Sequence, residues 1–165
     1  MITDLKLTNF KAFKSIKEKI KLAPLTVIVG PNSSGKSSIL HSLLLLKQTI
    51  NSNNKNSALS LDGQYLRYSN LSEISHGLPH SASAKVGFQL TTFSSWDKST
   101  EINITIKTKK DENSYHPVID NITTKTGNIV TDYSHITNSI VQNRLKSRKD
   151  PFLDGLFKNS GPSPK

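Results

Sequence analysis

Residues 25–38 read Leu-Thr-Val-Ile-Val-Gly-Pro-Asn-Ser-Ser-Gly-Lys-Ser-Ser, and this stretch decides the fold class. Its first five residues form an apolar, β-branched run, which is typical of a strand covered on both faces. Residues 30–37 follow directly and match G-x-x-x-x-G-K-S at every fixed position. Apolar side chains then recur at helical spacing over residues 37–50. A strand, a glycine loop and a helix in this order predict a phosphate-binding loop in an α/β fold.

The loop residues have distinct predicted roles. Gly30 and Gly35 let the backbone turn tightly and approach an anion, while the helix that follows offers its unpaired N–H groups. Lys36 would reach the β- and γ-phosphates of a nucleotide, and Ser37 would offer its hydroxyl to Mg²⁺. The competing interpretation is a glycine turn with an exposed lysine. Average residue usage makes the bare pattern a chance event of about one in a hundred for this length.

The remaining segments indicate an antiparallel β-subdomain. Residues 2–10 and 16–22 alternate as a hairpin, and Asp62-Gly63 favours a tight turn. Residues 84–93 and 101–109 predict a second antiparallel pair. Beyond Lys110 the pattern weakens to a strand–turn–strand hint at 126–128 and a short basic helix at 138–149. We therefore expect a nucleotide-binding lobe over 1–110, a weakly defined β-subdomain or helical extension over 111–149, and a disordered tail over 150–165.

Composition narrows the class of protein further. The 165 residues are enough for one domain, and 22 basic against 12 acidic residues give a formal charge of +10, which favours polyanionic partners. The absence of cysteine excludes disulfides and thiolate metal sites. Five histidines without an H-E-x-x-H pattern do not predict a metal site. No apolar run approaches membrane length and no secretory signal is visible, so we expect a cytoplasmic protein without membrane contact.

A family resemblance is carried by residues 9–13 (Asn-Phe-Lys-Ala-Phe) together with residues 24–38. These segments resemble the start of RecF/SMC/OLD-type ATPases, which are AAA family proteins of the ABC class found in bacterial genomes, some beside phage-defence nucleases. The leucine-rich stretch 39–48 is similar to the same family. The resemblance implies the N-terminal lobe of a P-loop NTPase, with a mixed sheet, one helix after the loop and an antiparallel β-subdomain.

The resemblance also implies a ligand and partners. It assigns ATP and Mg²⁺ to Gly30, Pro31, Asn32, Ser33, Ser34, Gly35, Lys36, Ser37 and Ser38, with Ser37 toward the metal. It places Asn9, Phe10 and Lys11 near the nucleotide, although such a string is more often only a strand end. It implies a homodimer, or a C-terminal half or partner nuclease. A DNA-facing strip would comprise Lys6, Lys11, Lys14, Lys17, Lys19, Lys21, Arg144, Lys146, Arg148 and Lys149, against which stands a plain solvated lysine face.

The acidic groups that ATP hydrolysis needs are not evident in the sequence. The nearest approach to an aspartate at the end of an apolar strand is residues 118–120, which Pro117 interrupts and Asn121 follows. Residues 159–163 lack the paired glycines of a Ser-Gly-Gly signature. We therefore expect a fragment or a split protein with no catalytic residue of its own, which binds ATP weakly and hydrolyses it slowly or not at all. The alternative is a non-catalytic nucleic-acid-binding module that retains a phosphate loop. A P-loop kinase or GTPase is disfavoured.

Overall fold

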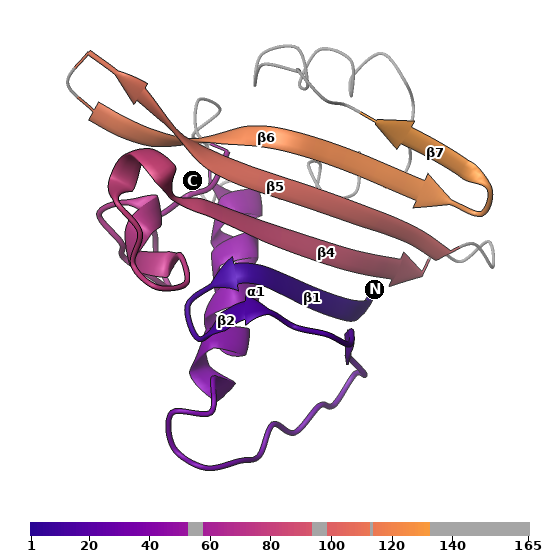
Figure 1. The fold of residues 1–165 in the computed structure, drawn as a ribbon. Helices are drawn as coiled ribbons and strands as arrows, with labels where there is room; N and C mark the ends of the chain where they lie inside the picture. The colour runs from indigo at the N-terminus through magenta and orange to yellow at the C-terminus, as the bar shows by residue number, and fades with distance from the viewer. Residues whose placement is uncertain (53–57, 94–98, 113, 133–165) are drawn as a thin grey trace, which may run out of the picture.

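The computed structural model describes residues 1–52, 58–93, 99–112 and 114–132. Within this part of the chain one α-helix and a seven-stranded sheet carry the architecture (Figure 1). The elements in chain order are β1 Ile2–Phe10, β2 Phe13–Ser15, β3 Ile20–Lys21, α1 Lys36–Asn51, the 3-10 turns η1 Leu71–Ile74 and η2 Ser81–Ser83, β4 Lys85–Phe93, β5 Ser99–Asp111, β6 Ser114–Thr126 and β7 Ile129–Asp132.

The sheet runs in the order β2-β1-β4-β5-β6-β7, and β3 also pairs with β1. Each neighbouring pair is antiparallel. β1 therefore lies between the short strands that follow it and β4, which comes after α1 in the chain. The predicted strands at 2–10, 84–93 and 101–109 and the turn at 126–128 are confirmed as β1, β4, β5 and the β6–β7 connection.

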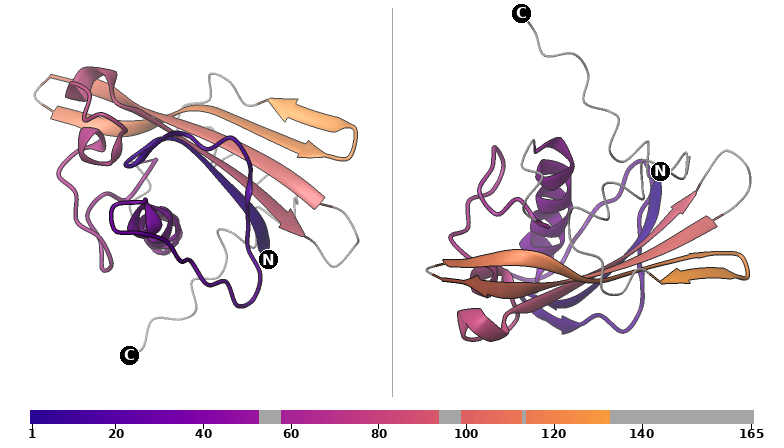
Figure 2. Two further views of the ribbon diagram at one scale, coloured as in Figure 1. Left: turned by 60° about the horizontal axis from the view of Figure 1, so that its bottom comes forward. Right: turned by 90° about the horizontal axis from the view of Figure 1, so that it is seen from above.

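Helix α1 covers one face of this sheet, as the views in Figure 2 show. Side chains alternate between the two faces along β4. Val86, Phe88 and Leu90 are buried on the face that α1 covers, and Lys85 and Gln89 lie on the opposite face. The core combines this face with α1 and the segment after it: Leu5, Leu7, Phe10, Leu45, Leu59, Leu61, Leu71, Ile74, Ala84, Val86, Phe88, Leu90 and Ile106. The α/β class with one helix after the loop and an antiparallel β-subdomain is confirmed.

Gln48 fastens the segment after α1 to the helix. Its side-chain amide donates to the carbonyls of Ser60 and Leu66, at 2.5 and 3.2 Å, and accepts from the Leu66 N–H at 3.0 Å. The side chain is buried and leaves no room for a Cβ at Gly63, which would lie 2.8 Å from it. A short hairpin results, closed by the bridge between Asp62 and Arg67, so the turn predicted at Asp62-Gly63 forms around residues 63–66.

The central strand predicted at 25–29 is wrong for this part of the chain. These residues form no strand, and Leu25, Val27 and Val29 are 83, 75 and 83% exposed. The segment leaves β3 and runs as an open connection to α1 (Figure 1). A strand needs a hydrogen-bonded neighbour, and no strand of the described residues lies beside it. The apolar pattern indicates a segment that favours burial, but the described residues do not cover it.

Two other expectations differ from the structure. Within the predicted strand 16–22 only β3 forms, while β2 lies just before it, because residues 17–19 break the pairing with β1 after the Ile16 N–H bond to the Leu7 carbonyl. The weak pattern beyond Lys110 conceals β6, a 13-residue strand that pairs with β5 along nearly its whole length. The basic helix predicted at 138–149 and the tail predicted at 150–165 lie outside the described residues.

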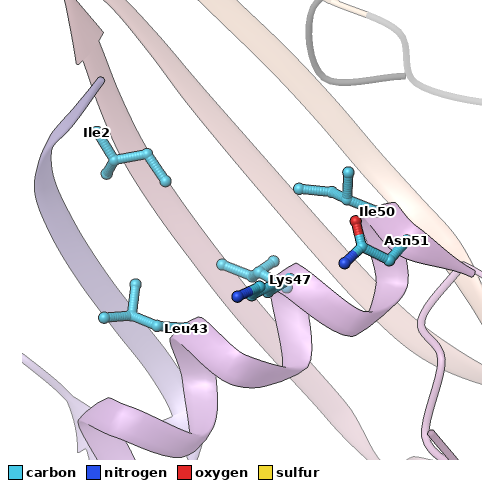
Figure 3. Close-up of a pocket in the computed structure, with 6 residues that line it drawn as sticks. Ile2, Leu43, Lys47, Ile50 and Asn51 are labelled. Atoms are coloured by element: carbon cyan, nitrogen blue, oxygen red, sulfur yellow. The ribbon is translucent and has the colours of Figure 1, made fainter. Parts of the chain in front are cut away.

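An apolar pocket opens between α1 and the start of β1 (Figure 3). It has a volume of about 170 Å³ and is lined by Ile2, Leu43, Leu46, Lys47, Ile50 and Asn51. Ile50 is 41% exposed, and Leu40, further toward the start of the same helix, is 52% exposed. Helix α1 therefore has a second, incompletely covered apolar side besides the one that faces the core.

Candidate phosphate-binding site

The loop between residue 29 and α1 has the backbone that an anion cradle requires. Gly30 and Gly35 have φ values of +152° and +92°, and Ser33 also has a positive φ of +64°. Side chains rarely tolerate such angles, which explains glycine at the two fixed positions of the motif. The Ser34 N–H donates to the carbonyl of Pro31 at 3.4 Å, which closes the turn.

The first turn of α1 is free to receive an anion. Gly35 is the N-cap residue, and no side chain caps the helix or places a carboxylate in its first turn. The leading N–H groups of a helix have no partner inside it, and the helix dipole adds positive potential there. A phosphate is the natural partner for such an end. The N–H groups of the loop and of the first turn of α1 therefore suit the phosphate chain of a nucleotide.

The Lys36 side chain bends back over the loop. Its Nζ donates to the carbonyl oxygens of Gly30 at 2.8 Å and Pro31 at 2.5 Å. The ammonium group therefore lies within the curve of the loop, where it adds a full positive charge to the dipole of α1. These hydrogen bonds are to neutral carbonyls, and a phosphate oxygen would be the stronger acceptor.

The two serines after Lys36 face different surroundings. Ser37 is exposed, which leaves its hydroxyl accessible to a metal ion beside the phosphates. Ser38 is 8% exposed and lies on the buried side of α1. Pro31, Asn32, Ser33 and Ser34 are exposed along the outside of the loop.

Phe13 packs directly against the loop, although the sequence alone assigned it no role. A Cβ built on Gly35 would lie 2.6 Å from Cζ of Phe13 and 3.1 and 3.2 Å from the two ring carbons beside it. The ring comes from the start of β2, more than twenty residues earlier in the chain. Gly35 is buried under it, whereas residues 30–34 are exposed. Only the fold brings these two residues together, so no local pattern could have revealed the contact.

Two of the three hairpin residues expected near the nucleotide, Phe10 and Lys11, have different surroundings. Phe10 is fully buried and meets Phe88 edge to face, with ring centroids 5.6 Å apart, so the expectation that it approaches a nucleotide is wrong. Lys11 places its Nζ 4.5 Å from the centroid of the Tyr68 ring, at the side of α1. The Tyr68 hydroxyl in turn lies 2.9 Å from Nδ1 of His41 on that helix. Burial, and then the charge of Lys11, lower the pKa of His41 below its ordinary value.

The acidic groups of the sheet are engaged away from the loop. Asp120 accepts from Lys107 and Lys85 at 2.7 and 2.6 Å, and these hydrogen bonds lower its pKa below the ordinary value. Lys85 and Lys107 pair in register and point away from the face that α1 covers. Asp120 is therefore a structural ion-pair partner on the outer face of the sheet, which agrees with excluding it as a metal-orienting aspartate.

Part of the basic strip predicted near the N-terminus is neutralised by ion pairs. Lys19 pairs with Glu101, and Lys21 pairs with Asp4 at 2.5 Å. A hydrogen bond from Lys19 holds the pKa of Glu101 low, and one from Lys21 does the same for Asp4. Residues 144–149, at the other end of the predicted strip, lie outside the described part of the chain.

The fold and the loop together define a class of protein: an α/β protein in which a glycine loop with the G-x-x-x-x-G-K-S motif leads into the N-terminus of its one described α-helix. A family model described as "AAA ATPase domain" matches residues 1–162, nearly the whole chain. The chain belongs to this family, and the predicted AAA-type ATPase is confirmed. A search of curated proteins finds no match. None of the helices in the described residues is long and apolar enough to cross a membrane.

Proposed function

We propose that the chain binds MgATP through residues 30–38. The main support is that the N-terminus of α1 has no side-chain cap. The loop before it contains two glycines with positive φ, and the Lys36 ammonium lies inside the curve of this loop. The N–H groups of the loop and first turn would hold the phosphates. Lys36 would exchange its two carbonyl acceptors for phosphate oxygens. Membership of the AAA ATPase domain family supports a nucleotide as the source of those phosphates.

The proposed metal contact is the Ser37 hydroxyl. It is exposed and directly follows the lysine, whereas the neighbouring Ser38 is buried. Mg²⁺ would neutralise charge on the β- and γ-phosphates, which is the chemistry that this ion supplies to nucleotide sites. The remaining metal positions would be filled by phosphate oxygens and water.

We propose that hydrolysis requires a partner, either a C-terminal half or a second subunit. Three carboxylates of the sheet, Asp4, Glu101 and Asp120, are held in ion pairs with lysines. The exposed apolar segment 25–29 and the half-open apolar side of α1 support a partner that adds strands beside this segment. A homodimer formed around two nucleotides and a partner nuclease are further proposals for the same assembly.

DNA binding is the second candidate, either as a partner of the ATPase or in a non-catalytic module. Its support is the formal charge of +10. The structure describes ion pairs at Lys19 and Lys21 and a ring contact at Lys11, so part of the predicted strip is already committed to contacts within the chain. ATP binding is the better supported of the two.

A thermal unfolding assay separates these functions. The wild-type chain, Lys36→Ala and the control Lys47→Ala are heated with Mg²⁺ and increasing ATP. Lys47 is on the same helix, but its ammonium lies 5.1 Å from the Tyr65 ring and away from the loop. Binding to the folded state raises the melting temperature with ligand concentration. We expect protection of the wild type and Lys47→Ala, but not of Lys36→Ala. Equal protection of all three would contradict the site.

A further inference from the structure

The turn between β1 and β2 has a strained backbone that the rest of the fold holds in place. Asn9 and Lys11 have φ values of +52° and +46°, which are uncommon for residues other than glycine. Phe10 lies between them, fully buried. Strained backbone of this kind persists only where its surroundings over-determine it, and it concentrates near functional sites.

Segment 74–76 supplies the restraint. The Lys11 N–H donates to the Ile74 carbonyl at 2.8 Å, and the His76 N–H donates to the Asn9 carbonyl at 2.9 Å. Nδ1 of His76 lies 2.9 Å from the Lys11 carbonyl, and because a carbonyl only accepts, this ring nitrogen is the donor. Backbone groups on both sides of Phe10 are therefore fixed to one segment.

The restrained turn brings Phe13 to Gly35. The ring fills the space that any side chain at Gly35 would need, with three ring carbons within 3.2 Å of the position of its Cβ. Gly35 is the residue from which α1 begins, and its own φ of +92° sets the direction in which the loop enters the helix. The ring thus covers the loop at the peptide that joins the cradle to the helix N-terminus.

A second contact ties the same turn to α1 at His41, nearly two helical turns beyond Gly35. The Lys11 ammonium lies over the Tyr68 ring, and the Tyr68 hydroxyl is hydrogen-bonded to His41. The turn therefore meets the loop and helix at two places, Gly35 and, through Tyr68, His41. A single contact could pivot, whereas two contacts fix an orientation.

We propose that Phe13 is a positioning residue for the phosphate loop: its ring, held by the turn clamped to segment 74–76, fixes Gly35 in the conformation that directs the leading N–H groups of α1 at the phosphates. This inference rests on the proposed binding of MgATP. Phe13 itself does not touch the nucleotide, so its loss acts through the loop backbone. The ring must be rigid and bulky, and a smaller side chain leaves Gly35 free to turn.

The test compares Phe13→Ala with Ile16→Ala in the full chain. Ile16 is a partly buried residue that packs on the core just past β2, and its N–H donates to the Leu7 carbonyl rather than touching the loop. For each variant two quantities are measured: the melting temperature without nucleotide, and the ATP concentration that gives half-maximal protection in Mg²⁺. Phe13→Leu, which retains apolar bulk, covers the case in which Phe13→Ala does not fold.

We expect both alanine variants to melt earlier, but only Phe13→Ala to need more ATP, on the order of tenfold more, the lower end of what loss of a supporting group costs in metal sites. Phe13→Leu is expected to need an intermediate ATP concentration. Equal ATP requirements for Phe13→Ala and Ile16→Ala would overturn the positioning role and leave the binding site intact. If Phe13→Ala does not fold, an unchanged ATP requirement for Phe13→Leu would do the same. Absence of protection in the wild type would overturn the binding proposal, and the positioning role with it.

Discussion

Replacement of Gly35 by alanine is the sharpest test of the loop geometry. The new Cβ would lie 2.6 Å from a ring carbon of Phe13, closer than a side chain of this rigidity allows, and the backbone would keep a φ of +92°. The left-handed backbone alone costs about 1–2 kcal/mol for a residue with a Cβ. Displacement of a packed ring adds about 1–3 kcal/mol, the usual range for overpacking. Gly35→Ala should therefore destabilise the fold by roughly 2–5 kcal/mol, a large part of the 5–15 kcal/mol typical of a domain.

Gly127 provides a matched control for the backbone term. It has a φ of +58° in the turn between β6 and β7, and a Cβ there would meet no atom within 4 Å. Gly127→Ala should therefore cost only the left-handed penalty, about 1–2 kcal/mol. Urea unfolding of the wild type and both variants, with a common slope, gives the two free energies. An equal loss in the two variants would refute the contact between Phe13 and Gly35.

Three further predictions concern the rest of the fold. Gln48→Ala should lower the free energy of unfolding by about 1–3 kcal/mol, because it removes a buried side chain and the hydrogen-bond partners of partly buried backbone groups, and urea unfolding measures this loss. Val27→Ala should change stability by less than about 0.5 kcal/mol in the same assay, because Val27 is 75% exposed, whereas a residue of a buried strand would cost far more. The Asp120 pKa is lowered, so its ion pairs stabilise fully above the ordinary aspartate value of about 3.9 and lose this effect as pH falls through the lower folded value. Melting temperatures taken at decreasing pH should therefore converge for wild type and Asp120→Asn in acid, and a constant gap would contradict the pairing.

The sequence predicted those elements whose apolar pattern is met by a covering partner in the fold. The alternation of Val86, Phe88 and Leu90 and the helical spacing after Lys36 survive in the structure because β4 and α1 cover each other. The pattern failed at residues 25–29, which are exposed. An apolar run indicates that a segment favours burial, but it does not show whether another part of the chain covers that segment. The pattern also failed at β6, which is rich in threonine and forms a long strand through pairing with β5 rather than through apolar alternation.

In the candidate site, too, the sequence predicted the residues of a continuous motif but not the contacts that depend on the fold. The glycines and Lys36 form a continuous motif, so their arrangement could be predicted from residues 30–37 alone. Phe13 could not be assigned, because its contact with Gly35 depends on how the β1–β2 turn lies against α1. Asp120 is the nearest match in the sequence to a metal-orienting aspartate. Its role as an ion-pair partner could not be predicted, because Lys85 and Lys107 come from other strands.

The proposal that residues 30–38 hold the phosphates of ATP is tested most directly by calorimetry. The dissociation constant of MgATP is measured for the purified chain and for Lys36→Ala. We expect Mg²⁺-dependent binding by the wild type that is lost in the variant, with little or no release of inorganic phosphate. Binding of equal strength in both proteins, or none in the wild type, would contradict the claim. Rapid phosphate release that depends on Lys36 would confirm the site but contradict the proposed need for a partner in hydrolysis.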